Sequence, residues 1–233
     1  MEARLSVDWD APWFQPWREP GERVLRHWAR APLHEALNQA GACTVRFVAH
    51  DAAGDEPYES FIFRTRTCPT RENAHDFFNG LAWLRRADAK SALNALQAAE
   101  IARAGVATRR GPVRDAATVF DENGAFLDAP DALWEALAAR EWRRLFVDMR
   151  PLWREARLEV FGHALLEKLL NPRKDLTAHV WCGAKEFTAG KLASKPFTPL
   201  PVLGVPGWTP ESENFSFYDD SVVFRAAAQR PRG

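Results

Sequence analysis

The chain has 233 residues, of which 46% are hydrophobic and 27% charged, as in an ordinary globular protein. Its 31 basic and 31 acidic residues cancel, which makes nucleic acid an improbable partner because counterion release needs an excess of Lys and Arg. Three scattered cysteines form no C-x-x-C pair, and this excludes a readable thiolate zinc site. No apolar run resembles a signal peptide or a membrane span, so we expect a cytoplasmic protein with no membrane partner.

The first thirty residues carry five Trp or Phe side chains among prolines, and we interpret them as an extended aromatic arm packed over the domain. A short helix over 32–40 is expected to end at Gly41. Residues 43–50 and 58–64 then alternate between polar and apolar side chains, with a turn-rich segment between them. This alternation predicts two strands of a hairpin or meander.

The middle of the chain predicts two helices and a second hairpin. Thr70 is a plausible N-cap for a helix with apolar residues at helical spacing, and Asp88 is expected to cap another that stops at Gly105. Asn123-Gly124 lies between two short apolar stretches, which is the favoured two-residue loop of a hairpin over 113–127.

The last third predicts helices over 128–149 and 153–170, separated by Pro151, and then a strand over 176–182. Five prolines over residues 196–210 indicate an extended tail. We therefore expect an α+β fold: one domain over 1–225, with several helices on a small, mainly antiparallel sheet, and a disordered tail over 226–233.

Two helical segments carry polar residues at spacings that suit a site. Asn73, His75, Asp76 and Asn79 cluster at a predicted helix start, where capping is the alternative explanation. His163 and Glu167 lie four residues apart on a helix expected to be buried; they could hold a metal, act as an acid/base pair, or satisfy one another in a structural network.

If these segments converge, His75, His163, Glu167 and His179 would supply ligands for zinc, manganese or iron. Glu167, Asp76 and Asp121 would then be the candidate catalytic carboxylates. Residues 64–114 contain ten basic side chains against four acidic ones, and this excess favours a small anionic substrate, including a phosphorylated one. The residues expected to bind it are Arg71, Asn73, Asn79, Arg85 and Arg114.

These residues favour a metal-dependent enzyme of the hydrolase type. The alternative is a non-catalytic ligand-binding or protein-interaction domain in which the His and acid pairs are structural. The sequence contains no P-loop, no Rossmann glycine motif, no nucleophile elbow and no H-E-x-x-H motif. It makes no prediction of the reaction, the particular substrate or the oligomeric state.

Several long motifs are spread over most of the chain. They are Pro69-Thr70-Arg71, Asn73, His75 to Asn79, Trp83-Leu84-Arg85, Leu93-Asn94, Gln97, Glu100-Ile101, Arg110-Gly111, Arg114-Asp115, Phe120 to Gly124, Gly162 to Glu167, Thr177-Ala178-His179, Leu200 to Trp208 and Phe217 to Asp220. Together they resemble an uncharacterised bacterial family, the domain-of-unknown-function family numbered 3025. Ala74 departs from the bulkier residue expected there. The resemblance implies a bacterial cytoplasmic protein and supplies no catalytic residue.

Overall fold

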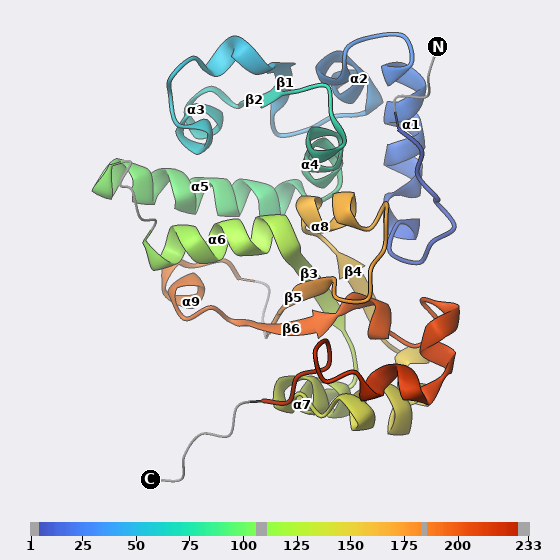
Figure 1. The fold of residues 1–233 in the computed structure, drawn as a ribbon. Helices are drawn as coiled ribbons and strands as arrows, with labels where there is room; N and C mark the ends of the chain where they lie inside the picture. The colour runs from blue at the N-terminus through green and yellow to red at the C-terminus, as the bar shows by residue number, and fades with distance from the viewer. Residues whose placement is uncertain (1–4, 106–110, 183–185, 228–233) are drawn as a thin grey trace.

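A four-stranded sheet separates a large helical part of the molecule from a smaller one (Figure 1). The computed structural model describes residues 5–105, 111–182 and 186–227. The strands run in the order β4 (Arg157–Val160), β3 (Gly124–Asp128), β5 (Thr177–Trp181) and β6 (Phe197–Pro201). Only the β3–β5 pair is parallel, so the predicted α+β class with a mainly antiparallel sheet is confirmed.

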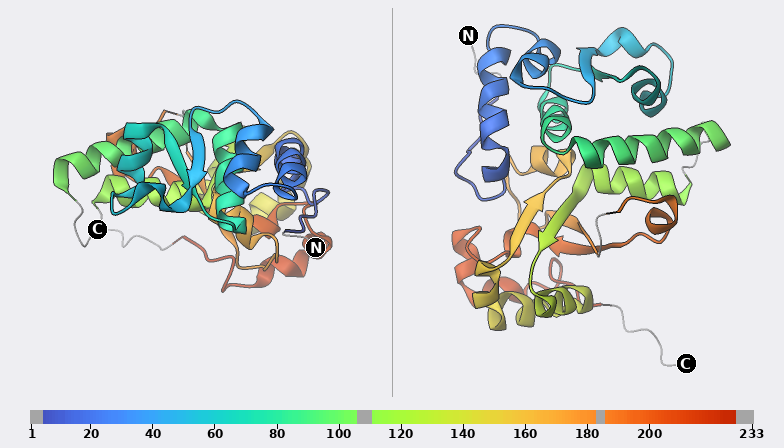
Figure 2. Two further views of the ribbon diagram at one scale, coloured as in Figure 1. Left: turned by 90° about the horizontal axis from the view of Figure 1, so that it is seen from above. Right: turned by 180° about the vertical axis from the view of Figure 1, so that it is seen from behind.

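Most helices lie on one side of this sheet, as both Figure 1 and Figure 2 show. They are α1 (Arg18–Trp28), α2 (Leu33–Ala40), α3 (Tyr58–Thr65), α4 (Ala74–Arg85), α5 (Ala87–Ala104), α6 (Pro112–Asn123), α8 (His163–Lys168) and α9 (Ala189–Ala193). A parallel pair, β1 (Arg46–Ala49) and β2 (Thr67–Thr70), joins them. On the other side lie α7 (Asp131–Ala139), the π-helical turn Arg144–Asp148 and several 3-10 turns.

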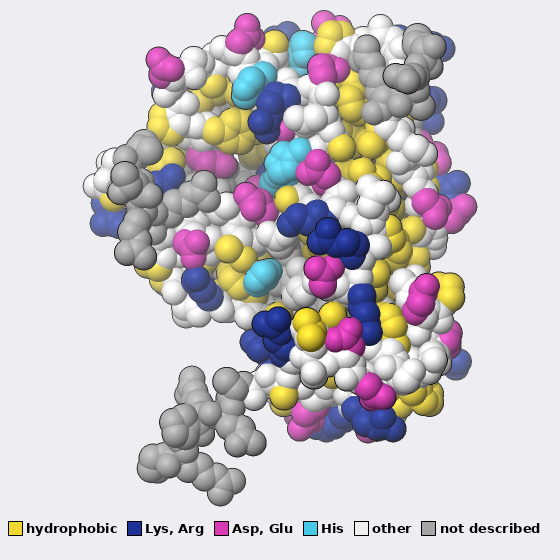
Figure 3. Space-filling view, viewed as in Figure 1, with side chains coloured by type: hydrophobic (Ala, Val, Ile, Leu, Met, Phe, Trp, Pro, Cys, Tyr) yellow, Lys and Arg dark blue, Asp and Glu magenta, His cyan; other side chains and the backbone are white. Residues whose placement is uncertain are grey.

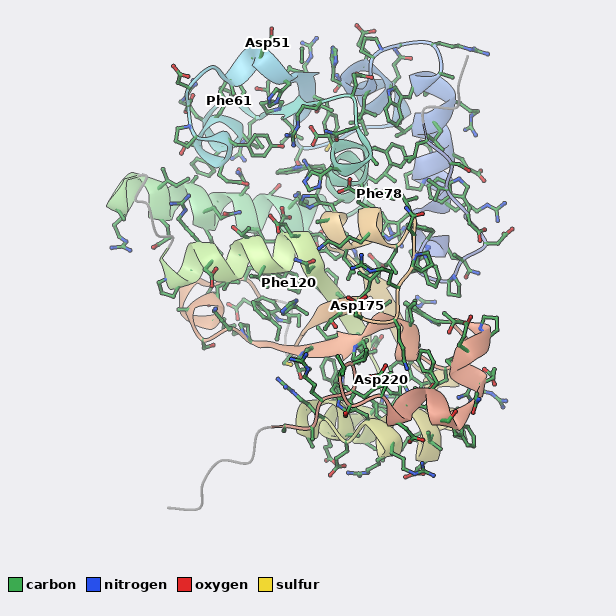
Figure 4. All side chains as sticks on the ribbon, viewed as in Figure 1. Asp51, Phe61, Phe78, Phe120, Asp175 and Asp220 are labelled. Carbon is green, nitrogen blue, oxygen red and sulfur yellow. The ribbon has the colours of Figure 1, made fainter. Side chains whose placement is uncertain are left out.

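The buried apolar side chains form one contiguous core. Phe120 on α6 lies near its centre, between that helix and the sheet (Figure 4), and contacts the rings of Phe161, Trp181 and Phe197. Aromatic rings bury large areas, so this contact fixes the rotation of α6 about its axis. The opposite face of α6 is thereby directed toward α5 and α8, where the polar residues lie.

A close backbone crossing joins the end of α6 to the start of α8. Gly124 follows α6, and its carbonyl accepts hydrogen bonds from the amides of Phe161 and Gly162 at 2.9 and 2.8 Å. A Cβ atom on Gly162 would lie 2.4 Å from the backbone nitrogen of Asn123, closer than any side chain can approach. Glycine is therefore required at this crossing, which sets His163 beside the last turn of α6.

Two strand predictions were wrong. Residues 58–64 form helix α3, in which the adjacent Phe61 and Ile62 are both buried while Phe63 is exposed. The partner of β1 is instead the parallel strand β2. Asn123-Gly124 ends a helix rather than joining two strands, since Val113, Ala116, Ala117 and Phe120 bury one helical face. Asn-Gly is also a common helix ending, and the short apolar stretches concealed the helical period.

Three further predictions need correction. The predicted helix over 153–170 is a 3-10 turn over Arg150–Arg154, strand β4 and the short helix α8, because residues 157–160 pair with β3. The N-terminal arm contains helix α1, although Trp13 and Trp17 are buried as expected. The cap of α4 is Asn73, whose side chain accepts from the amide of Asp76, and not Thr70.

The helix ends at Gly41 and Gly105, and the strand expected over 176–182, lie where they were predicted. Asp88 does not cap its helix, because α5 begins at Ala87 and Asp88 lies in its first turn. Most of the tail predicted over 226–233 falls outside the described residues. Among the helices described, none has the length and hydrophobicity needed to cross a membrane.

Candidate functional site

A cavity of about 440 Å³ opens where helices α3, α4, α5, α6 and α8 meet. Figure 3 shows histidine and acidic side chains around a hollow in the middle of the face seen in Figure 1. The side chains around the cavity are predominantly polar, and they come from segments more than a hundred residues apart in the chain. Seven of the predicted site residues line it, namely Arg71, His75, Asp76, Asn79, Arg114, Asp121 and His163.

A chain of hydrogen bonds connects four of the predicted residues. His75 Nδ1 lies 2.9 Å from Glu167 Oε2, and His75 Nε2 lies 3.1 Å from His163 Nε2. His163 Nδ1 in turn lies 2.8 Å from the carbonyl oxygen of Asp121. Glu167 and His75 are 39% and 33% exposed, whereas His163 is only 7% exposed. The chain therefore runs from the solvent-exposed rim into the protein.

The partners at the buried end determine which atoms carry protons. A carbonyl oxygen only accepts, so His163 Nδ1 carries the proton of that bond. Burial, which outweighs the attraction of Asp121, lowers the pKa of His163 to about 4, so its Nε2 accepts from His75 near neutral pH. His75 and Glu167 then share one further proton along their hydrogen bond, either as imidazolium and carboxylate or as imidazole and carboxylic acid.

Asp121 extends the chain into a buried ion pair. Lys90 Nζ lies 2.6 and 2.9 Å from the two carboxylate oxygens of Asp121, and it also donates to Asn79 Oδ1 at 2.8 Å. Burial opposes ionisation of Asp121, but Lys90 and His163 together hold its pKa below the usual value. Asp121 is therefore a buried carboxylate, already neutralised by Lys90.

Asn79 carries the network on to helix α3. Its Nδ2 donates to the Tyr58 hydroxyl at 3.1 Å, and that hydroxyl lies 3.2 Å from Cys68 Sγ. Burial raises the pKa of the Cys68 thiol to about 12, and burial next to Cys68 raises that of Tyr58. Both groups stay protonated at neutral pH, so Cys68 lacks the thiolate character of a nucleophile.

Arg71 and Asp76 form a closed pair at the cavity wall. Arg71 Nε and Nη2 donate to the two oxygens of Asp76 at 3.1 and 3.0 Å, and the Arg71 amide donates to the same carboxylate at 2.6 Å. Asn73 caps helix α4 through the Asp76 amide. Asp76 thus fixes the start of α4, which positions His75.

Four predicted residues do not line the cavity, within the ranges that the structure describes, namely Asn73, Arg85, Glu167 and His179. Arg85 bonds to Glu159 on β4, Asn73 serves as the helix cap, and His179 on β5 contacts the ring of Phe197 instead. Glu167 reaches the cavity only through His75.

The structure adds Tyr58, Glu59, Lys90, Gln97 and Thr118 to the site. Tyr58 and Glu59 were missed because their helix was interpreted as a strand. Lys90, Asn94 and Gln97 are buried polar residues at helical spacing on α5, all at most 5% exposed. Their spacing at positions i, i+4 and i+7 places them on one stripe of the helix, and this polar stripe was the signal that could have revealed them.

The predicted metal ligands are only partly brought together. The Nε2 atoms of His75 and His163 converge, but Glu167 bonds to the other nitrogen of His75 and His179 lies elsewhere. Across the three described stretches, no group of three or more His, Cys, Asp or Glu side chains is arranged to hold a metal ion. The arrangement offers at most two imidazole nitrogens to one ion.

Sequence comparison assigns the chain to a family without an assigned activity. The model of a family described as a protein of unknown function (DUF3025) matches residues 45–191 and 184–228. The chain matches none of the curated proteins and none of the solved structures with which it was compared. The matched segments include every residue of the hydrogen-bond chain from Glu167 to Asp121, and the protein belongs to the DUF3025 family.

Proposed function

We propose that this protein is an enzyme of the hydrolase type, in which the Glu167–His75 pair, supported by His163, provides acid–base catalysis on a small anionic molecule. The observation that carries the proposal is the hydrogen-bond chain Glu167–His75–His163–Asp121 at the wall of a 440 Å³ cavity. A cavity of this volume suits a small molecule. An imidazole held by a carboxylate at its mouth is a common acid–base arrangement.

The partly exposed end of the chain is the part that can react. His75 Nε2 carries the proton that it donates to His163, and a leaving-group oxygen in the cavity can take the place of His163 as its acceptor. The proton then passes to that oxygen as its bond to the substrate breaks. A water oxygen forms the new bond to the substrate, and the proton that this water releases restores the His75–Glu167 pair.

His163 and Glu167 have different roles in this scheme. His163 stays neutral, since burial lowers its pKa to about 4, and so it orients His75 without competing for the proton. Glu167 accepts from His75 Nδ1 and stabilises the charged imidazole. Asp121 holds the tautomer of His163 through its carbonyl oxygen, with its own carboxylate neutralised by Lys90.

A panel of p-nitrophenyl esters with and without anionic groups, including p-nitrophenyl phosphate, tests the proposal through release of p-nitrophenolate. We expect His75→Gln to lower kcat by about 100-fold or more on any ester that the wild type hydrolyses. His27→Gln, on α1 and away from the cavity, is the matched control. Equal rates for wild type and His75→Gln would refute the role of His75. A wild type that binds small anions but hydrolyses no ester would instead favour the ligand-binding domain.

One observation favours a second candidate, a transition-metal enzyme. Both Nδ1 atoms are held by other groups, so both Nε2 atoms face one point and are 3.1 Å apart. Zinc binds imidazole nitrogen at about 2.0–2.1 Å, so one ion could contact both. After zinc loading and desalting, one zinc per chain that is lost in both His75→Gln and His163→Asn would establish this candidate. If His75→Gln and His163→Asn retain as much zinc as a His27→Gln control, this candidate is excluded.

A further inference from the structure

Arg114 differs from the other cations around the cavity. Its Nε atom is buried without a hydrogen-bond partner, and no other hydrogen bond or ion pair of its guanidinium occurs within the described parts of the chain. Arg71, by contrast, donates twice to Asp76, and Lys90 is saturated by Asp121 and Asn79. Leaving a buried N–H group without an acceptor is costly, so this Nε atom in the cavity wall indicates a place for an anion.

Gln97 provides a second donor in the wall of the same cavity. The residue is 5% exposed, and its Oε1 accepts from the Thr118 hydroxyl at 3.2 Å. Thr118 lies one turn after Arg114 on α6, and Gln97 faces it from α5. The bond to Thr118 fixes the carboxamide, whose Nε2 has no partner in the described structure. Gln97 and Arg114 both line the cavity, so this wall presents donors to its contents.

This donor wall lies away from the histidines. Arg114 lies seven positions before Asp121 on helix α6, and the carbonyl of Asp121 holds His163. Two turns of helix are about 10 Å, and long helical side chains lean toward the N-terminus, away from Asp121. The anion position and the catalytic position are therefore at different ends of one cavity.

Glu59 is the acid that would oppose an anion here. It lines the cavity, and its Oε2 accepts from Asn94 Nδ2 at 2.6 Å. Burial, with a contribution from Asp121, raises the pKa of Glu59, whereas Asn94, Lys90 and Arg114 act in the opposite direction. Glu122 is the other lining carboxylate without a cation partner among the described side chains, and it follows Asp121 directly. Glu122 therefore belongs to the histidine end.

We infer that Arg114 and Gln97 form a subsite for an oxyanion, a carboxylate or phosphate group at the far end of an elongated substrate, about two helical turns from the bond that reacts at His75. The inference rests on the proposed function for the position of the reacting bond, but the anion subsite stands without it. The anionic group is then a recognition group and is not itself attacked. A substrate with a small uncharged head and an acidic tail fits this arrangement.

Calorimetric titration of inorganic phosphate and of acetate, at constant ionic strength, tests the subsite without any assumption about catalysis. We expect at least one of these anions to bind the wild type and to bind Arg114→Gln at least tenfold more weakly. Arg143→Gln removes the same charge from an exposed position outside the cavity and should bind like the wild type. His75→Gln should also retain binding. Which anion binds more tightly identifies the oxyanion.

Unchanged affinity in Arg114→Gln, an equal loss in Arg143→Gln, or no binding of either anion by the wild type would overturn the subsite. If Arg114→Gln fails to fold, as judged by circular dichroism, Arg114→Lys serves instead. It keeps the charge but loses the forked geometry, so anion binding should weaken while the fold is retained.

The distance between the anion subsite and the reacting bond is tested by hydrolysis of p-nitrophenyl half-esters of dicarboxylic acids of increasing length. The ratio of kcat/KM for each half-ester to that of its methyl ester should reach a maximum at an intermediate length in the wild type. In Arg114→Gln that maximum should disappear, whereas Arg143→Gln, which lies outside the cavity, should keep it. If this ratio is instead highest for the shortest half-ester, the anion binds beside the histidines and the separate subsite is refuted. Retained anion binding with no hydrolysis would refute the proposed function alone.

Discussion

Two buried carboxylates near the start of helix α5, Glu159 and Asp121, belong to hydrogen-bond networks that end in different places. Glu159 on β4 is 6% exposed and accepts from Arg86 at 2.6 and 2.9 Å and from Arg85 at 3.4 Å. The side chain of Asp121 on α6 is 13% exposed and accepts from Lys90, itself 6% exposed. The two arginines are 29% and 38% exposed, so the first network ends in solvent.

The second network continues instead through His163 and His75 to a cavity. Both carboxylates are neutralised by neighbouring cations, so burial and charge pairing do not distinguish them. They differ in their networks: in the described structure the hydrogen bonds of Asp121 lead on to titratable groups with accessible atoms, and those of Glu159 do not. A buried ion pair indicates a site when its hydrogen bonds lead onward to a cavity, and otherwise indicates only stability.

The largest expected difference is in stability. Asp121→Ala leaves Lys90 buried without a counter-charge and should lower the free energy of unfolding by about 3–5 kcal/mol. Glu159→Ala should cost less, about 1–3 kcal/mol, because Arg85 and Arg86 can turn toward water. Urea denaturation of both variants measures this, and equal losses would contradict the distinction.

Acid should affect the Asp121 network through His163. Its folded-state pKa of about 4 lies below the ordinary 6.5, so between these values the unfolded chain binds more protons and stability falls as pH is lowered. The loss between pH 7 and pH 4 should be smaller in His163→Asn than in the wild type by about 3 kcal/mol. Urea denaturation at several pH values tests this, and parallel curves would show that His163 does not titrate below its ordinary range.

The backbone crossing that joins Asp121 to His163 should tolerate no side chain. Gly162→Ala places a Cβ against the backbone of Asn123 and should destabilise the protein by about 1–3 kcal/mol. Gly190→Ala on α9 meets open space, so it should be neutral or stabilising by up to about 1 kcal/mol. Thermal unfolding compares the two, and a harmless Gly162→Ala would show that the crossing can relax.

The smallest expected effect is a gain in stability rather than a loss. Arg114→Met removes a cation that has no ion-pair partner among the described residues, so stability should rise by up to about 1 kcal/mol. Arg86→Met removes a cation paired with Glu159 and should lower stability. A loss of stability in Arg114→Met would mean that this residue has a structural partner.

The sequence predicted most of the polar residues of the site but not their arrangement. His75 and Asn79, and His163 and Glu167, were identified from four-residue spacing, and all four belong to the observed network. The spacing of residues along one helix cannot show which other helix their side chains face. The connection of His75 to His163 depends on α4 packing against α8, and these helices begin 89 residues apart.

Local patterns misled where tertiary pairing decides the conformation. Residues 157–160 are too short a segment for their own pattern to distinguish a helix from a strand, and they became β4 because β3 offers an edge. Residues 113–123 have a helical apolar face, which the Asn123-Gly124 signal obscured. Both errors lie beside the site, because the chain changes direction sharply there.

The sequence by itself determined the α+β class, the helix ends at Gly41 and Gly105, the strand β5 and the polar residue types available for chemistry. These depend on local preferences that each segment carries alone. Only the tertiary structure decided that Lys90 neutralises Asp121 and that His163 faces His75. It also decided that Arg114 Nε has no hydrogen-bond partner among the described residues. Such pairings depend on how helices pack across a shared core, and that packing follows from all the apolar contacts together.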